Sequence, residues 1–499
     1  MLEREVKLGA GPAFHLPDLA GVVEGIVVAA PETIRLETVY YDTPDLRLAR
    51  WGVSLRRRAG EGWTLKLSGP PSAPGKPAAI LERDELAFEG SATKPPRAAL
   101  EVVRAYVRKS ELIPVARLST VRKRVRLLDE AGARVAEVVD DEVSVRDGRR
   151  VAARFREIEV EVAAGNGADG IITPLVTRLR GAGAGAPDLT PKHIRALGPR
   201  AIEPPEVSAD PVPAGAAARE VIKHALAESI ANLLHHDPLV RTGRDPEAVH
   251  QARVATRKLR SNLRTFGLLL DMEWVEPLRS ELGWLSLSLG AVRDREVLLG
   301  RLRASAKALP ANDVRSAASL LHLLEAEIDS LRNKLAEDLE SQRYVELLEL
   351  LVAAAHSPPT LPDADQAAAG MLPAFATAPW RRLRSAVRHL PESPADPELH
   401  RIRILAKRAR YAAEAVAPVA GPDATAFARA AAKLQTVLGE HQDSVTAQAW
   451  LRAAKVSGRR AFVAGELIAL ERIAAANARA EWPRVWSSLD RKRLRDWMS

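Results

Sequence analysis

Residues 249–266 read VHQARVATRKLRSNLRTF, and the interpretation of the whole chain starts from this stretch. At 100° per residue it separates into two faces of opposite chemistry, one basic and one apolar. No acidic residue interrupts it. For a single helix, a solvated charged face is the ordinary explanation of such a pattern. The stretch predicts an amphipathic helix whose basic row is His250, Arg253, Arg257, Arg260 and Arg264.

A second copy of this pattern makes a plain surface helix a weaker explanation. The copy begins 150 residues later and matches both the basic and the apolar offsets. A similar segment follows each copy, LGAVRD at 289–294 and LGEHQD at 438–443, in which His441 stands where the first copy has Val292. Two basic helices facing each other across one groove would concentrate positive potential and suit a linear polyanion. The second row is His400, Arg403, Lys407, Arg408 and Arg410, at the offsets of His250, Arg253, Arg257, Lys258 and Arg260.

The duplicated rows resemble the CHAD domain, the conserved histidine alpha-helical domain, over residues 215–499. The resemblance implies an all-helical domain of two similar four-helix halves, at about residues 215–355 and 366–499, with a basic central groove. It also implies that this groove binds inorganic polyphosphate. The implied polyphosphate-binding residues are His250, Arg253, Arg257, Lys258, Arg260, Arg264, His400, Arg403, Lys407, Arg408, Arg410 and His441.

The composition favours an anionic partner and excludes several chemistries. A length of 499 residues suggests two or three domains, and a net charge of +9 with a pI near 9.8 suggests a negatively charged ligand. The chain has no cysteine, which excludes disulfides and thiolate metal sites. Aromatic residues are scarce in the basic rows, whereas single-stranded nucleic acid normally stacks its bases on such residues. We therefore expect no specific nucleic-acid partner.

The N-terminus and the hydropathy predict a location. MLEREVK is charged almost at once, unlike a secretory signal, and no apolar run approaches the length of a membrane span. We expect a soluble cytoplasmic protein without a membrane partner, which could associate with polyphosphate granules. The sequence does not determine the oligomeric state.

Residues 1–162 show period-two alternation interrupted by turn residues, as is typical of β-strands. For one strand alone, a sheet with one wet face explains such alternation. The distribution across strands indicates more, because acids gather on the first and last strands and bases on the strands between them. Grouped carboxylates hold hard divalent cations, and ranks of Arg and Lys hold phosphate oxygens. The pattern predicts a combined metal and phosphate site.

Five motifs in this region occur in a fixed order: EREVK, YYDTPDLRLARWGVSLRRR, TLK, LERDE and REIEVEVAA. Together they resemble the CYTH superfamily, also called triphosphate tunnel metalloenzymes, over residues 1–200. The opening Glu-x-Glu-x-Lys, here Glu3, Glu5 and Lys7, is the signature of that family. The resemblance implies an eight-stranded antiparallel β tunnel barrel whose lumen holds the triphosphate of the substrate.

The resemblance also implies roles for individual residues. The register of the basic strand around Arg122 can slide by a residue or two, so Arg117, Lys123 and Arg126 are alternatives there. The implied ligands of Mg²⁺ or Mn²⁺ are Glu3, Glu5, Glu157, Glu159 and Glu161. The implied phosphate-binding residues are Lys7, Arg56, Arg58, Lys66, Arg83, Arg122, Arg124 and Lys192. The residues expected to act in catalysis are Glu3, Glu5, Lys7 and Lys66.

The sequence thus predicts an α+β multidomain protein. A CYTH-like tunnel domain at 1–200 is followed by a Pro-rich linker at 201–214 and by a CHAD-like helical domain at 215–499. The linker combines prolines and small residues without apolar periodicity, which suits a tether.

Two functions of different class fit these features. The first is a divalent-metal-dependent inorganic triphosphatase, cleaving tripolyphosphate to pyrophosphate and phosphate, with a helical domain that binds polyphosphate. The second is a non-catalytic polyphosphate-binding or granule-targeting protein. The grouped carboxylates favour the enzyme, because a pure anion binder gains nothing from them unless a metal lies between. Adenylate cyclase activity ranks third. Chain-length preference, metal identity and the role of the helical domain, feeding substrate or anchoring, stay open.

Overall fold

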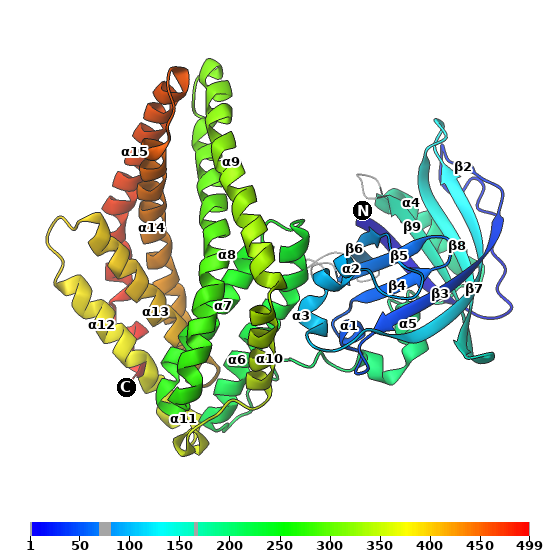
Figure 1. The fold of residues 1–499 in the computed structure, drawn as a ribbon, viewed down its shortest axis with the longest axis horizontal. Coiled ribbons are helices and arrows are strands. Elements are labelled where there is room, and N and C mark those ends of the chain that lie inside the picture. The colour runs from blue at the N-terminus through cyan, green and yellow to red at the C-terminus, as the bar shows by residue number, and fades with distance from the viewer. Residues whose placement is uncertain (1, 69–80, 164–167, 499) are drawn as a thin grey trace. The chain divides into compact units, whose positions relative to one another are not determined.

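The computed structural model describes residues 2–68, 81–163 and 168–498. The side chains at 2–4, 68, 81–83, 163 and 168–169 lie outside this description. The chain divides into two compact units, Met1–Glu206 and Val207–Ser499, the first built on strands and the second on helices (Figure 1). The predicted α+β architecture is confirmed.

The described part of the first unit forms one antiparallel sheet in the order β2-β7-β3-β4-β5-β6-β1-β9-β8. Because β7 pairs with β8 as well as with β3, each of the eight longer strands has a neighbour on both sides. The predicted eight-stranded antiparallel arrangement is confirmed, and the short β2 beside β7 is additional. The strands are β1 (Leu2–Ala10), β2 (Val27–Val28), β3 (Glu32–Asp42), β4 (Ser54–Arg58), β5 (Gly62–Ser68), β6 (Leu81–Phe88), β7 (Ile113–Leu128), β8 (Arg134–Asp147) and β9 (Arg150–Ala163).

The period-two alternation of β9 separates two environments. Ile158, Val160 and Val162 pack with α4 (Ala168–Gly181) in a buried apolar cluster on one face of the sheet. The intervening glutamates point to the other face, where Glu159 and Glu161 line a cavity. Alternation that would suit a solvent-exposed face of a sheet therefore marks residues that line a polar cavity here.

Short helices complete the first unit. Helix α5 (Lys192–Leu197) packs its end against an apolar cluster that includes Leu118 and Val143, and thereby brings Lys192 to the interior. The others are α1 (Arg47–Arg50), α2 (Arg97–Val102), α3 (Arg104–Val107) and the 3₁₀ turn at Pro199–Ile202.

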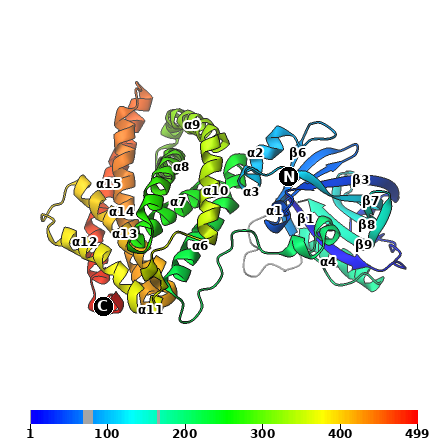
Figure 2. The same cartoon turned by 60° about the horizontal axis from the view of Figure 1, so that its bottom comes forward.

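The second unit consists of helices throughout its described length, apart from short connections (Figures 1 and 2). The basic stretch that opened the sequence analysis forms α7, and its copy forms α13. The helices are α6 (Ala218–Thr242), α7 (Ala248–Thr265), α8 (Met272–Ala306), α9 (Ala311–Glu340), α10 (Gln342–His356), α11 (Ala368–Met371), α12 (Thr377–Arg388), α13 (Asp396–Ala420), α14 (Pro422–Ala453) and α15 (Arg459–Leu489).

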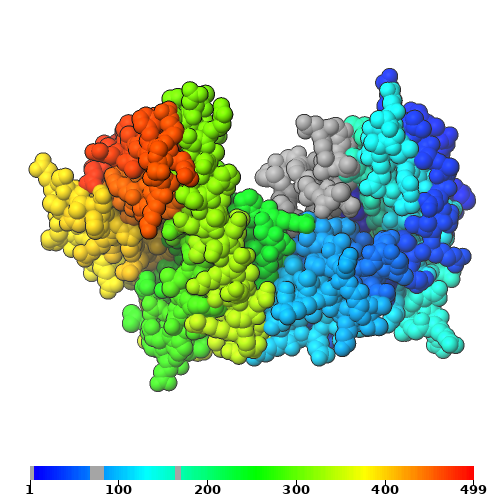
Figure 3. Space-filling view, turned by 45° about the horizontal axis from the view of Figure 1, so that its top comes forward, coloured from blue at the N-terminus to red at the C-terminus, as the bar shows by residue number. Residues whose placement is uncertain are grey.

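Two similar halves are visible, α6–α9 and α12–α15, with α10 added to the first (Figure 1). The long hairpins α8/α9 and α14/α15 stand side by side, and in the space-filling view they form neighbouring green and orange-red projections (Figure 3). A shared apolar cluster, including Leu302, Leu324, Leu451 and Leu467, joins them. Helices α7 and α13 contact each other directly where the halves meet. No described helix is both long enough and apolar enough to cross a membrane.

Candidate functional sites

The first unit contains a polar cavity of about 170 Å³, called here the strand cavity. Its volume corresponds to about six water molecules at the density of the liquid, enough for a small anion with ions or water. Seven strands and the segment around α5 contribute side chains. The lining residues are Glu5, Lys7, Tyr40, Ser54, Arg56, Arg58, Lys66, Glu85, Arg122, Glu159, Glu161, Pro191, Lys192 and His193.

Three carboxylates gather on one side of this cavity. Glu5 on β1 and Glu159 and Glu161 on β9 each offer an oxygen, and these three oxygens lie within 4.8 Å of one another. Antiparallel pairing explains the grouping, since Glu5 lies opposite Glu161 in the β1–β9 register. Three hard oxygen donors at this spacing are suited to a divalent cation such as Mg²⁺ or Mn²⁺.

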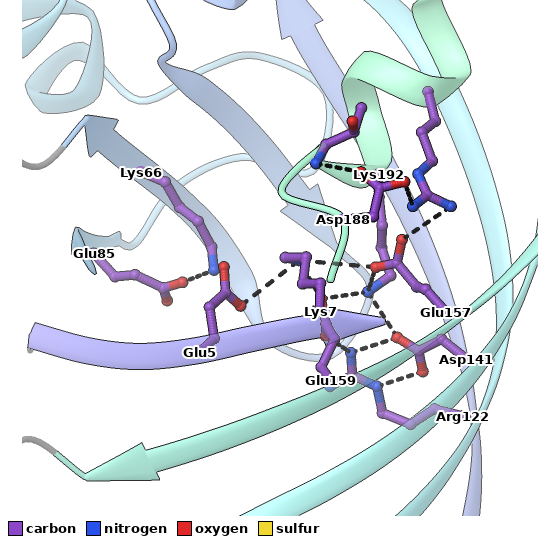
Figure 4. Close-up of polar contacts among 12 residues, drawn as sticks. Glu5, Lys7, Lys66, Glu85, Arg122, Asp141, Glu157, Glu159, Asp188 and Lys192 are labelled. Atoms are coloured by element: carbon purple, nitrogen blue, oxygen red, sulfur yellow. Dashed lines mark hydrogen bonds and ion pairs between the residues drawn. The ribbon is translucent and has the colours of Figure 1, made fainter. Parts of the chain in front are cut away.

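Behind the carboxylates lies a network of buried ion pairs (Figure 4). Lys192 Nζ lies 2.8 Å from Asp141, 2.7 Å from Glu157 and 2.9 Å from Glu159. Burial lowers the pKa of Lys192, but the three carboxylates outweigh it and hold that pKa well above its usual value. Lys7 contacts Glu159 directly and lies 3.6 Å from Glu5.

The same charges determine the protonation state of the buried glutamates. Burial raises the pKa of Glu159, but Lys192, Lys7 and Arg122 outweigh it and hold the pKa well below its usual range. Glu157 differs, because burial keeps its pKa raised despite the nearby Lys192. Glu159 is therefore an ionised carboxylate at neutral pH, as a metal ligand must be.

The opposite wall of the cavity is basic. Arg56 and Arg58 come from β4 and Lys66 from β5. Arg58 pairs with Glu61 at 2.9 Å and Lys66 with Glu85, whereas Arg56 forms no ion pair with any carboxylate among the described residues. Burial, and then the charge of Arg56, lower the pKa of Lys66 to about 8. This wall offers positive charge that an anion can neutralise.

Some predicted residues do not line the cavity. Glu157 is fully buried behind it, held by Lys192, and does not join the other three glutamates. Arg124 pairs with Glu32 at 2.6 Å outside the cavity. The side chains of Glu3 and Arg83 lie outside the described residues.

The basic strand β7 has a definite register. Arg122 lines the cavity and donates from Nε and Nη2 to Asp141, at 2.8 and 2.7 Å. The alternatives Arg117, Lys123 and Arg126 are exposed and line no part of the cavity.

Sequence reasoning missed Asp141 and Glu85, because it assigned acids only to the first and last strands. Asp141 is fully buried on β8, directly opposite Arg122 on β7 and Glu157 on β9. The signal was present in the run Asp140–Glu142, where one acid of an alternating strand had to face inward. Tyr40 and His193, which stack at 5.2 Å, also line the cavity without having been predicted.

In the second unit, two adjoining cavities of about 300 and 540 Å³ lie along α7 and α13. They share Arg253, Arg257, Ile404 and Lys407, and together they are called here the central groove. The predicted rows do face each other across it. Of the predicted residues, the groove is lined by His250, Arg253, Arg257, Arg260, Arg264, His400, Arg403, Lys407 and Arg408.

The cations of the central groove repel one another. Burial, and then Arg257 and Arg403, lower the pKa of Lys407 to about 7. Burial and neighbouring arginines also lower the pKa of Arg257 and of Arg264. Among the described residues, Arg253 alone of the arginines on α7 pairs with an acid, Asp294 at 2.7 Å. An anionic ligand would relieve this repulsion.

Three predicted polyphosphate-binding residues lie away from the groove. Lys258 lies 3.8 Å from Glu228, beside a separate hollow next to α6. Arg410 pairs with Glu414 at 2.7 Å. His441 is buried, with Nε2 3.2 Å from Asp396, and does not line the groove.

Comparisons with known proteins divide the chain in a similar way. The model of the CYTH domain matches residues 1–192, and the model of the CHAD domain matches residues 224–452. Two proteins of Mycobacterium tuberculosis are each 32% identical to this chain over 528 residues. They are uncharacterized protein MT2285 of strain CDC 1551 / Oshkosh and uncharacterized protein Rv2226 of strain ATCC 25618 / H37Rv. Each alignment covers 98% of this chain and 96% of the relative.

Two solved structures are similar to part of the chain. PptA from Streptomyces chartreusis is 26% identical, with a TM-score of 0.46 over 55% of this chain and 100% of that one. The CHAD domain from the plant Ricinus communis is 27% identical, with a TM-score of 0.48 over 57% of this chain and 95% of that one.

Proposed function

The chain belongs to the family of proteins that carry a CYTH domain followed by a CHAD domain, and from this premise we propose that it is a divalent-metal-dependent inorganic triphosphatase. In this proposal the first unit hydrolyses tripolyphosphate to pyrophosphate and phosphate. The second unit binds inorganic polyphosphate.

One observation supports the enzymatic proposal above all others. A cluster of three carboxylates, Glu5, Glu159 and Glu161, and a basic wall that includes Arg56 line the same small cavity. Carboxylates repel phosphate oxygens, and Lys7 and Lys192 offset only part of their charge, so a further cation between the carboxylates and the anion would make this arrangement favourable. This combination is expected of a metal–phosphate site and not of a simple anion binder.

The residues present fit Mg²⁺ or Mn²⁺. Their donors are carboxylate oxygens, which these ions prefer, and Glu159 is held ionised by its cationic neighbours. When bound, such an ion would polarise phosphoryl oxygens and lower the pKa of a coordinated water.

The protein's own groups would bind and orient the anion. Arg56, unpaired within the described residues, is free to bind phosphate oxygens, and Arg58 and Lys66 can turn to them from their glutamate partners. Lys7 and Lys192 keep the carboxylates in place and compensate for their charge. Fixed cations of this kind stabilise the charge that develops as a phosphoanhydride bond breaks.

The test is phosphate release from tripolyphosphate with Mg²⁺, with Mn²⁺ and with excess EDTA. We expect activity only with metal. Glu5→Gln keeps the size of the side chain but removes its charge, and should lower kcat/KM by at least about a hundredfold. Glu130→Gln is the matched control, because Glu130 is an exposed turn residue. Full activity in EDTA or in the Glu5→Gln variant would contradict the proposal. Parallel assays with ATP and thiamine triphosphate test whether tripolyphosphate is the preferred substrate.

A role limited to polyphosphate binding is the second candidate, and the central groove is the observation that favours it. Arg257, Arg260, Arg264 and Arg403, which form no ion pair among the described residues, and a lysine whose pKa is lowered to about 7 line a groove between two helices. Packed helices lie about 10 Å apart, which should admit a thin chain and not a DNA duplex about 20 Å wide. Polyphosphate binding without any hydrolysis by the full chain would favour this candidate over the enzyme.

A further inference from the structure

A third basic hollow lies beside the central groove, between α12 and α13. Its volume is about 1000 Å³, and it is called here the α12 groove. Helix α12 contributes Arg381 and Arg382, and α13 contributes Arg401 and Arg408. Neither half of the duplicated pattern that identified the central groove includes Arg381 or Arg382.

The four arginines of the α12 groove are exposed, and none forms an ion pair with a carboxylate among the described residues. The only acid in its lining, Glu398, accepts a hydrogen bond from the backbone N–H of Ala395 at 2.7 Å and so caps the start of α13. Exposed arginines with no internal partner are available to an external anion.

Helix α12 presents these arginines because its other side is fixed. Trp380 and Leu383 are buried, and Trp380 stacks on Trp486 of α15 at 5.6 Å. Arg384, also on that helix, is instead held by Asp490 at 2.9 Å. Helix α12 contains four arginines and no acid, so the side of α12 that faces α13 is positively charged.

The α12 groove adjoins the central groove. His400 and Ile404 line both the α12 groove and one part of the central groove, and Arg408 lines both the α12 groove and the other part. The side chains of one helix, α13, thus border basic hollows on two sides. A chain-like anion that leaves the central groove meets further arginines without a break in positive charge.

In the first half of the unit, the hollow beside α6 has a different lining. Helix α6, which takes the place of α12 there, contributes Glu228 to that hollow, and Glu228 lies 3.8 Å from Lys258. The α12 groove therefore differs from the hollow beside α6, because its lining includes four exposed arginines that form no ion pair among the described residues. Its lining contains no Trp, Tyr or Phe, which argues against a single-stranded nucleic acid that would stack its bases.

We propose that the α12 groove is a second polyphosphate-binding segment, which holds the part of a long chain that extends beyond the central groove. This inference rests on the proposed binding of polyphosphate by the second unit. It predicts that Arg381 and Arg382 matter only when the ligand is longer than the central groove. That groove follows α7, whose 18 residues span roughly 27 Å.

The experiment measures binding of a short and a long polyphosphate to the full chain, in EDTA so that metal-dependent hydrolysis is stopped. The short chain is chosen to span no more than α7. Arg381→Gln/Arg382→Gln should weaken long-chain binding about tenfold and leave short-chain binding unchanged. Two lost phosphate contacts should also reduce the slope of log K against log salt by roughly 1.4, using the single-strand value.

The control variant is Arg315→Gln/Arg472→Gln, which makes the same change in net charge at exposed positions with no ion pair among the described residues. Equal losses for both chain lengths, or no loss for the long chain, would overturn the α12 groove as a separate segment. Tighter binding of single-stranded RNA than of polyphosphate would overturn the ligand. Failure of the unaltered chain to bind even short polyphosphate would instead refute the proposed function on which the inference rests.

Discussion

The carboxylate network of the strand cavity concentrates buried cations and the central groove concentrates half-buried ones, in opposite electrostatic states. In the network, Lys7 and Lys192 lie among carboxylates, which outweigh burial and raise the pKa of both. In the central groove, Lys407 lies among arginines, and burial and these charges lower its pKa to about 7. The charges of Lys7 and Lys192 are neutralised by carboxylates of the protein, whereas the charges of the central groove would be neutralised only by a bound anion.

The same contrast occurs within the strand cavity, between cations that pair with the buried carboxylates and cations on the basic wall. Burial, and then the charge of Arg56, lower the pKa of Arg58 and of Lys66 on the basic wall, as happens in the central groove. Arg122, by contrast, pairs with Asp141, and its pKa is raised. Arg58 and Lys66 each have one glutamate partner and line the basic wall, whereas Lys7, Lys192 and Arg122 lie among the carboxylates that they hold in position.

The largest expected effect tests this contrast through stability. Lys192→Met leaves Asp141, Glu157 and Glu159 without their shared partner, so it should destabilise the first unit by about 3–5 kcal/mol. Lys407→Met removes a repelled cation and should leave the second unit equally stable or more stable. Hydrogen exchange resolved by peptide reports each unit separately. Similar destabilisation by both substitutions would show that the two sets of cations do not differ.

The next effect concerns ligand binding in the central groove. Arg257→Glu/Lys407→Glu replaces two facing cations by anions and should weaken polyphosphate binding by at least about a hundredfold, because each reversal both removes a contact and adds repulsion. Any preference for polyphosphate over duplex DNA should be lost as well. Arg315→Glu/Arg472→Glu, a matched reversal on the exposed surface, should have a small effect, and circular dichroism should show unchanged helix content. Retained affinity in the groove variant would mean that the two rows do not form the site.

The sequence alone predicted the basic rows well, for a physical reason. Helical periodicity fixes which residues share a face, and duplication located the two faces that meet. It did not predict that His441 turns toward Asp396, since that contact depends on how α13 and α14 pack. The sequence also wrongly assigned Lys258 to the central groove. A residue at the edge of a helical face can lie against either neighbouring helix, and Lys258 lies beside α6.

In the strand unit, alternation gave cavity-lining positions at Glu5, Arg56, Arg58, Lys66, Glu159 and Glu161, but it also selected Glu157, which lies buried behind the cavity. It could not give cross-strand register, which depends on turn geometry and pairing. For that reason Arg122 could not be separated from Arg117, Lys123 and Arg126. The register also explains Asp141, whose inward position follows only once β8 is aligned between β7 and β9.

A smaller effect is expected from pH. The pKa of Lys407 is about 7 in the free groove, and a bound polyanion should raise it, so binding takes up a proton when the pH exceeds about 7. Affinity should therefore fall about tenfold between pH 6 and pH 8. Lys407→Arg keeps the charge at every pH in this range and should remove that part of the dependence. An unchanged pH profile in Lys407→Arg would show that Lys407 does not contact the ligand.

The smallest effect concerns two glycines that the duplication places beside equivalent arginines. A Cβ at Gly290 would lie 3.6 Å from Nε of Arg253, and a Cβ at Gly439 would lie 3.4 Å from Nε of Arg403. Both are ordinary contacts, so alanine fits without moving either guanidinium. Because glycine costs about 0.5–1 kcal/mol inside a helix, Gly290→Ala and Gly439→Ala should each stabilise the second unit by about that amount.

Polyphosphate affinity should change less than about twofold in these alanine variants, since the guanidinium groups keep their places. Leucine at either position would occupy the space of the guanidinium and should weaken binding, as titration with a long polyphosphate in EDTA would show. If alanine weakens binding as much as leucine does, the arginines must approach the helix backbone more closely when the ligand is bound. The glycines would then serve ligand binding directly, and the repeated Leu-Gly pairs at 289–290 and 438–439 would be part of the binding pattern.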